Sequence, residues 1–133
     1  MLILESYKQL FLTHLEKEFT PRDPNNLYEP INYILQIGGK RLRPLLAMMF
    51  CEVYGSNPKK AIDAALAVEV FHNFTLVHDD VMDHAPLRRG KPTVHKKWNL
   101  NTAILSGDAM MIRAYQFLES YEGELNKQLV SLF

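Results

Sequence analysis

Apolar side chains recur at helical spacing along most of the chain. Near the N-terminus they lie at Leu4, Tyr7, Phe11, Leu12, Leu15 and Phe19. This spacing predicts a helix over residues 2–19. Residues 21–30 hold three prolines among Asp and Asn, a composition that predicts a surface linker.

Further helices are predicted downstream. A short one follows Pro30 and ends at the glycine pair 38–39, because glycine readily adopts the left-handed conformation of a helix end. The next has Pro44 in its first turn and ends at Gly55. Another opens near Pro58 and continues to Asp83. Its middle, AALAVEVFHNFTLV, is apolar almost all round, as expected of a helix buried inside a bundle.

The second half of the chain continues this organisation. Residues 84–97 are rich in charge and proline and predict a loop, whereas residues 101–121 resume a helical pattern. Gly107 within that pattern indicates close approach to a neighbouring helix. No strand-type alternation and no internal repeat is visible. We therefore predict an all-α fold, a single domain over residues 1–133 built as a bundle of long antiparallel helices.

Composition narrows the functional classes. The chain has 133 residues, with 15 Lys and Arg against 15 Asp and Glu, so its formal net charge is zero, unlike that of a general nucleic-acid binder. Its single cysteine, Cys51, excludes an internal disulfide and a thiolate metal cage, and fits a reducing compartment. No apolar run approaches the ~20 residues of a membrane span, and the N-terminus lacks the basic start of a secretory signal. We expect a soluble, cytoplasmic protein that does not bind nucleic acid.

Three carboxylates form the sharpest chemical feature. In DDVMD, Asp83 lies four residues after Asp79 and three after Asp80, so all three can converge on one side of a helix. They fall at its C-terminal end, where the helix dipole disfavours anions. A divalent cation such as Mg²⁺ would offset this repulsion. The alternative is a solvated acidic helix end, but the strongly apolar helix before it favours a metal site.

Two basic clusters suggest anion binding. Arg88 and Arg89 are adjacent in LRRGKPTVH, and guanidinium groups suit the bidentate geometry of a diphosphate. Lys40, Arg41 and Arg43 surround a helix start, where free backbone N–H groups favour an anion. Each cluster alone would be read as a solvated basic turn. Together with the aspartates, they suggest two anionic groups, one of them held through metal.

Histidines leave a second metal hypothesis open. His72 lies two turns before Asp79 on the same helix face, and serves equally well as a core residue or a ligand. The pair His78–Asp79, completed by His72 and Asp108, could form an all-α His-Asp metal-dependent phosphohydrolase site. This hypothesis leaves the other two aspartates and both basic clusters without a role.

Three motifs in this order resemble a known family. GGKRLRP, FHNFTLVHDDVMD and LRRGKPTVH are similar to the N-terminal half of the trans-isoprenyl diphosphate synthases, or polyprenyl synthetases, from about Gly38 to Tyr115. The resemblance implies an isoprenoid-synthase helix bundle, represented here by its N-terminal helices. It also implies a prenyltransferase that joins an allylic diphosphate to isopentenyl diphosphate.

The resemblance assigns roles by position. It implies that the three aspartates form the first aspartate-rich motif, which binds Mg²⁺ and the allylic diphosphate. Arg88 falls where the family holds the allylic diphosphate, and Arg89 where it holds the isopentenyl one. The remaining positions implied for isopentenyl diphosphate are Lys40, Arg43 and His72.

Product length is also implied by the resemblance. The fifth and fourth residues before the first aspartate, Phe74 and Thr75, help form the floor of the growing-chain pocket in the family. A Phe there, and only two residues between Asp80 and Asp83, suggest an all-trans product of fifteen to twenty carbons, leaning to geranylgeranyl diphosphate. The alternative is that Phe74 is simply a core residue.

The chain also departs from the family. Complete members are more than twice as long and carry a second aspartate-rich motif, and nothing after Asp108 resembles it. We therefore interpret the chain as an N-terminal portion, expected to be inactive alone and to associate, in the complete enzyme as a homodimer. The rival hypothesis is a non-catalytic partner of a full-length synthase.

Overall fold

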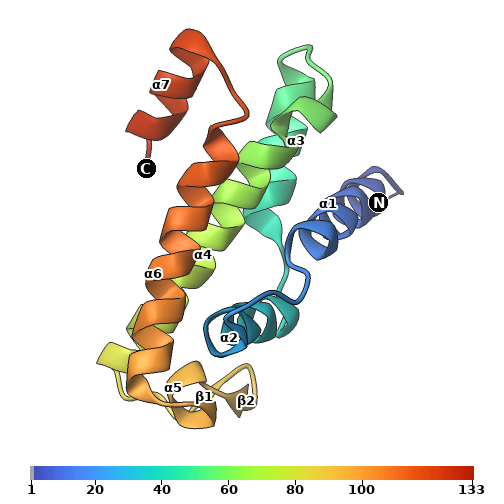
Figure 1. The fold of residues 1–133 in the computed structure, drawn as a ribbon. Coiled ribbons are helices and arrows are strands. Elements are labelled where there is room, and N and C mark those ends of the chain that lie inside the picture. The colour runs from blue at the N-terminus through green and yellow to red at the C-terminus, as the bar shows by residue number, and fades with distance from the viewer. Residues whose placement is uncertain (1) are drawn as a thin grey trace. The chain divides into compact units, whose positions relative to one another are not determined.

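The computed structural model describes residues 2–133, and helices make up nearly all of their regular structure (Figure 1). The helices are α1 (Leu2–Glu18), α2 (Asn25–Gln36), α3 (Leu42–Val53), α4 (Ile62–Met82), α5 (Val94–Lys97), α6 (Leu100–Leu118) and α7 (Gly123–Ser131), and the 3₁₀ turn η1 (Pro58–Ala61) precedes α4. The all-α prediction is confirmed. No helix in this described range is both long and apolar enough to cross a membrane.

The chain divides into two compact units. Unit 1 holds the residues up to Glu18, Lys40–Glu69 and Arg113–Phe133, and unit 2 holds Phe19–Gly39 and Val70–Ile112. The long helices α4 and α6 each contribute one part to either unit. All three aspartates and both arginines of the LRRG motif belong to unit 2.

In unit 1, α1 packs against α3, and α3 packs against η1. The predicted N-terminal helix is present, and it buries Tyr7, Phe11 and Leu15, which recur every four residues along one face. Pro44 lies in the first turn of α3 as predicted, where its missing N–H removes no helical hydrogen bond. After α6, the chain turns into α7, a helix that was not predicted from the sequence.

In unit 2, α2 and the adjoining parts of α4 and α6 surround a core that includes Ile31, Ile34, Val77 and Met110. The predicted linker over residues 21–30 is too long, because α2 already begins at Asn25 and Pro30 lies inside it. Pro30 removes one helical hydrogen bond. However, it is itself buried on the stripe that α2 turns toward the core, and burial of that stripe stabilises the helix.

The long buried-type helix is confirmed. From residue 64 to residue 77 no position of α4 is exposed. The loop predicted over residues 84–97 is instead structured: β1 (Leu87–Arg88) pairs with β2 (Lys91–Pro92), and α5 follows. Strands of two residues are too short to show the alternation that identifies a strand in a sequence.

Candidate active site

The last turn of α4 and the residue that follows it carry the three aspartates, and their environments differ. Asp79 and Asp83 are exposed, whereas Asp80 is 5% exposed. The backbone N–H of Asp83 donates to the carbonyl oxygen of Asp79 at 2.8 Å, so the helical turn continues past Met82. Two carboxylates therefore face solvent one turn apart, while the third is turned inward.

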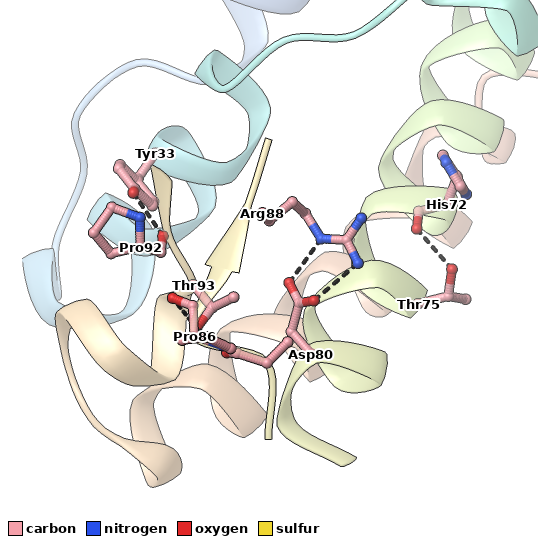
Figure 2. A network of polar contacts seen from close by, with 9 residues as sticks. Tyr33, His72, Thr75, Asp80, Pro86, Arg88, Pro92 and Thr93 are labelled. Atoms are coloured by element: carbon pink, nitrogen blue, oxygen red, sulfur yellow. Dashed lines mark hydrogen bonds and ion pairs between the residues drawn. The ribbon is translucent and has the colours of Figure 1, made fainter. Parts of the chain in front are cut away.

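The buried carboxylate of Asp80 binds Arg88 through a bidentate ion pair. Arg88 Nε lies 2.7 Å from Asp80 Oδ2, and Nη2 lies 2.9 Å from Oδ1 (Figure 2). The hydrogen bonds to Asp80 raise the pKa of Arg88 above its usual value, against a smaller opposing effect of burial. Charge-assisted bonds of this parallel geometry are among the strongest in proteins. The pair fixes the arginine against the end of α4.

The hairpin that carries the two arginines turns through Arg89 and Gly90, which have φ values of 51° and 76°. Left-handed φ at both central residues is the requirement of a type I′ turn, the turn that matches the twist of paired strands. Arg88 pairs with Lys91 across the hairpin, and Arg89 lies at the turn itself. The two adjacent arginines therefore occupy different structural positions.

Hydrogen bonds hold the hairpin from both sides. The Tyr33 hydroxyl on α2 donates to the carbonyl oxygen of Pro92 at 2.7 Å, and the buried Thr93 hydroxyl donates to that of Ala85 at 2.7 Å (Figure 2). Lys97 Nζ also lies 4.2 Å from the centre of the Tyr33 ring. Sequence reasoning missed Tyr33 and Thr93. The signal that could have indicated the hairpin is the nearby Gly90 and Pro92, because glycine and proline commonly mark turns.

The GGKR segment separates its three basic residues. Lys40 and Arg43 are exposed in unit 1, whereas Arg41 is 6% exposed and forms a buried ion pair with Glu69. Arg41 is therefore engaged within the protein, which leaves the other two cations of the segment to face solvent. Arg89, in unit 2, lies against the backbone of Gly39, the residue before Lys40.

The remaining predicted residues lie along α4. His72 is half-buried, and its carbonyl oxygen accepts a hydrogen bond of 2.7 Å from the Thr75 hydroxyl (Figure 2). The half-buried Phe74 ring packs edge-on against Phe71, at 5.3 Å between centroids, and against His78, at 4.8 Å. Phe74 thus lies on the helix face of His78, and Thr75 nearer the face of Asp79.

His78 packs against α6. Its Nε2 lies 3.2 Å from the carbonyl oxygen of Ile104 and 3.6 Å from Asp108 Oδ1. A Cβ atom at Gly107 would collide with the imidazole ring, which confirms the close approach predicted for that glycine. The histidine of the His-Asp pair therefore points toward a neighbouring helix, while Asp79 faces solvent.

Comparison with known proteins identifies the family. The polyprenyl synthetase profile matches residues 24–133. The chain belongs to this family. It is 46% identical over 101 residues to the geranylgeranyl diphosphate synthase of Methanosarcina mazei, over 76% of this chain and 31% of that protein. It is 41% identical over 116 residues to the geranylgeranyl pyrophosphate synthase of Geoglobus acetivorans, over 87% of this chain and 36% of that protein.

Solved polyprenyl synthetase structures have the same fold over nearly all of the chain. A geranylgeranyl pyrophosphate synthase structure superposes with a TM-score of 0.95 at 56% identity, over 98% of this chain and 40% of its own. Heptaprenyl diphosphate synthase from Staphylococcus aureus superposes with a TM-score of 0.86 at 31% identity, over 96% and 41%. The chain spans about a third of the length of the curated relatives it matches.

A polyprenyl synthetase implies a divalent metal, and the donor set at the end of α4 fits one. Within residues 2–133, no group of three or more His, Cys, Asp or Glu side chains is arranged to hold a metal. Mg²⁺ does not require such a cage, because it commonly uses one or two carboxylates together with substrate phosphate oxygens and water. The exposed Asp79 and Asp83 supply two hard oxygen donors, whereas both oxygens of Asp80 already accept from Arg88.

Proposed function

We propose that the chain is the N-terminal portion of a Mg²⁺-dependent prenyltransferase that condenses an allylic diphosphate with isopentenyl diphosphate. The product would be an all-trans polyprenyl diphosphate of fifteen to twenty carbons, with geranylgeranyl diphosphate favoured. One observation carries the proposal: the Asp80–Arg88 pair holds a hairpin with two arginines at the helix end that presents two exposed carboxylates. Relatives named geranylgeranyl diphosphate synthases support it.

The three aspartates would have different roles at the allylic site. Asp79 and Asp83 would hold Mg²⁺ and, through it, the allylic diphosphate. Asp80 would act mainly by orienting Arg88, since its two oxygens are occupied by that guanidinium. Arg88 can still offer an N–H donor to the diphosphate, because a guanidinium has five such donors and Asp80 uses two.

Isopentenyl diphosphate would bind to the second set of cations. Lys40 and Arg43 are exposed, and so is Arg89, so all three can meet a charged ligand from solvent. His72, the fourth member of this set, is half-buried on α4. We assign Arg41 no ligand, because it is buried and paired with Glu69.

The reaction would break the allylic C–O bond and form a new C–C bond. Mg²⁺, when bound, would stabilise the negative charge that develops on the departing diphosphate. Arg88 would donate hydrogen bonds to the same oxygens. The double bond of isopentenyl diphosphate would attack the allylic carbon, and a proton would then be lost, with the released diphosphate as the candidate acceptor. Water must be kept from the cationic carbon, and the apolar side chains of α4 before the aspartates, such as the half-buried Leu76, can do so.

Phe74 and Thr75 would limit product length. Phe74 is half-buried, so part of its ring remains open to a growing hydrocarbon chain. Its edge-on contacts with Phe71 and His78 hold the ring in a defined orientation. A rigid ring at the floor would stop elongation at a short product.

The 133-residue chain, purified alone, is expected to be inactive and to associate. It carries one aspartate-rich cluster, whereas the family resemblance calls for two. Along one side of α3, Leu42, Leu46, Phe50 and Val53 are exposed. An apolar stripe of this kind favours association, and we propose a homodimer for the complete enzyme, with residues 1–133 forming part of one all-α domain.

Steady-state kinetics of the full-length gene product test the proposal. Asp79→Ala and Asp83→Ala should lower turnover far more than affinity for isopentenyl diphosphate, because metal-assisted ionisation acts in the transition state. Lys40→Ala and Arg43→Ala should mainly raise the Michaelis constant for isopentenyl diphosphate. Lys59→Ala, which removes an exposed cation of η1, is the control and should change neither constant.

Two results would contradict the proposal. The same kinetic signature from the aspartate and the cation variants would exclude two separate diphosphate sites. If no allylic primer leads to incorporation of labelled isopentenyl diphosphate, the chain is better explained as a non-catalytic partner of another synthase.

A further inference from the structure

In the turn between α2 and α3, the side chain of Arg89 from the hairpin fills the space beside the Cα atom of Gly39. An ideal Cβ at Gly39 would lie 2.7 Å from Arg89 Nη1 and 3.0 Å from both Cζ and Nη2. These distances are well below an ordinary carbon contact of about 3.5–4.0 Å. The guanidinium therefore occupies the space that any other residue at position 39 would need for its side chain.

The other glycines nearby do not have this contact. Gly38 and Gly90 also have left-handed φ values, 83° and 76°, so backbone conformation alone explains a glycine at either position. A Cβ at Gly38 would meet only the Gln36 carbonyl oxygen, at 3.8 Å, and one at Gly90 would meet no atom within 4 Å outside its two chain neighbours, Arg89 and Lys91. At Gly39 two requirements favour glycine. Its φ of 150° is one that other residues rarely adopt, and a side chain there would collide with Arg89.

Arg89 differs from Arg88 in how it is held. Among residues 2–133, no ion pair or hydrogen bond fixes its guanidinium, whereas that of Arg88 is bound to Asp80 through two hydrogen bonds. Its location is set by the left-handed φ of 51° at the hairpin turn and by contact with the Gly39 backbone. A guanidinium that is held by van der Waals contact with bare backbone, and not by hydrogen bonds, keeps its N–H donors available for an anion.

We propose that Gly39 is a positioning residue: its bare backbone places the Arg89 guanidinium so that its N–H groups can bind the diphosphate of the isopentenyl substrate. This inference rests on the proposed function for the identity of the ligand. A side chain at position 39 displaces the guanidinium rather than the backbone, because the atoms it meets are the end of a flexible side chain. The effect of the substitution therefore depends on the presence of Arg89.

The test uses the 133-residue chain and inorganic diphosphate as the probe. Chelator is present throughout, so that metal-dependent binding at the aspartates does not contribute. Calorimetric titration compares Gly39→Ala, Arg89→Ala and the double variant, with Gly38→Ala as the control that shares the left-handed backbone but lacks the contact. Loss of a bidentate guanidinium contact should weaken binding about tenfold.

We expect Gly39→Ala and Arg89→Ala each to weaken binding about tenfold, and the double variant to bind no more weakly than Arg89→Ala alone. Gly38→Ala should bind as the unmodified chain does. The ¹⁵Nε–H resonance of Arg89 should move in Gly39→Ala and not in Gly38→Ala, which a general loss of stability would not produce.

Failure of the inference is distinct from failure of the proposed function. If Arg89→Ala binds diphosphate normally, the assignment of Arg89 to a diphosphate is wrong. If Arg89→Ala weakens binding but Gly39→Ala does not, the positioning role of Gly39 is wrong and the proposed function stands. If Gly39→Ala does not fold, the circular dichroism of the double variant decides: recovery of helix supports displacement of Arg89, and continued unfolding overturns it.

Discussion

Gly107→Ala tests how closely α4 and α6 approach, because two effects of known size oppose each other at this position. In a helix interior, Ala is more favourable than Gly by about 1 kcal/mol. Against this gain, the new methyl group collides with the imidazole of His78. The sign of the net effect therefore depends on what it costs to move that ring.

The structure gives an approximate size for this cost. A displaced ring loses the hydrogen bond to the Ile104 carbonyl oxygen, worth about 1 kcal/mol. It also loses the edge-on contact with Phe74, worth about 0.5–1.5 kcal/mol. The sum of the two losses exceeds the gain in helix propensity. We therefore expect Gly107→Ala to lower the free energy of unfolding by about 1 kcal/mol.

Urea denaturation followed by circular dichroism measures this change, and a second background isolates its cause. In His78→Ala the space beside Gly107 is empty, so the same Gly107→Ala substitution should raise the free energy of unfolding by about 1 kcal/mol. The reasoning fails if Gly107→Ala stabilises the chain equally in both backgrounds. That result would mean that the imidazole does not occupy the space beside α6.

Three further predictions follow from separate parts of the structure. A double-mutant cycle of Asp80→Ala and Arg88→Ala, read from urea denaturation, should give a coupling of about 2 kcal/mol, and additive effects would exclude a formed ion pair. Phe74→Ala in the full-length enzyme should give longer products on chromatography, and an unchanged product distribution from folded protein would remove Phe74 from the pocket floor. Burial raises the pKa of Tyr121 above its usual 10.0, so its contribution to stability is present below pH 10 and is lost as pH rises through the folded pKa. As pH rises above 10, the free energy of unfolding of Tyr121→Phe should therefore fall less than that of the unmodified chain. Parallel pH profiles of this free energy in the two proteins would contradict the prediction.

Much of the helical framework could be predicted from the sequence, because it follows from local apolar spacing. The helix through Phe11 and the long helix before the aspartates are both present, and Gly107 does lie at a close helix contact. The interior proline of α2 was misread, because Pro30 is stabilised there by burial in a core that no local pattern reveals. The hairpin was missed since each of its strands has only two residues.

The candidate site could be predicted in its residue types but not in its pairings. Spacing along one helix brings Asp79, Asp80 and Asp83 together, and adjacency groups Arg88 with Arg89. It does not indicate that Asp80 is buried and bound by an arginine that reaches it only when the hairpin folds back. Contacts of this kind depend on tertiary structure. A sequence pattern alone therefore does not distinguish the buried Asp80 from the exposed Asp79 beside it.

The two-residue turn of the hairpin also bears on how this segment can vary. Most surface loops accept insertions and deletions more readily than the elements they connect. Here, the two-residue turn fixes the register of the pair, so one residue added or removed between Leu87 and Pro92 would change that register. Single substitutions at the exposed Lys91 leave that register intact. The segment should therefore diverge in composition while keeping its length, and alignments of related chains should show no gap within it.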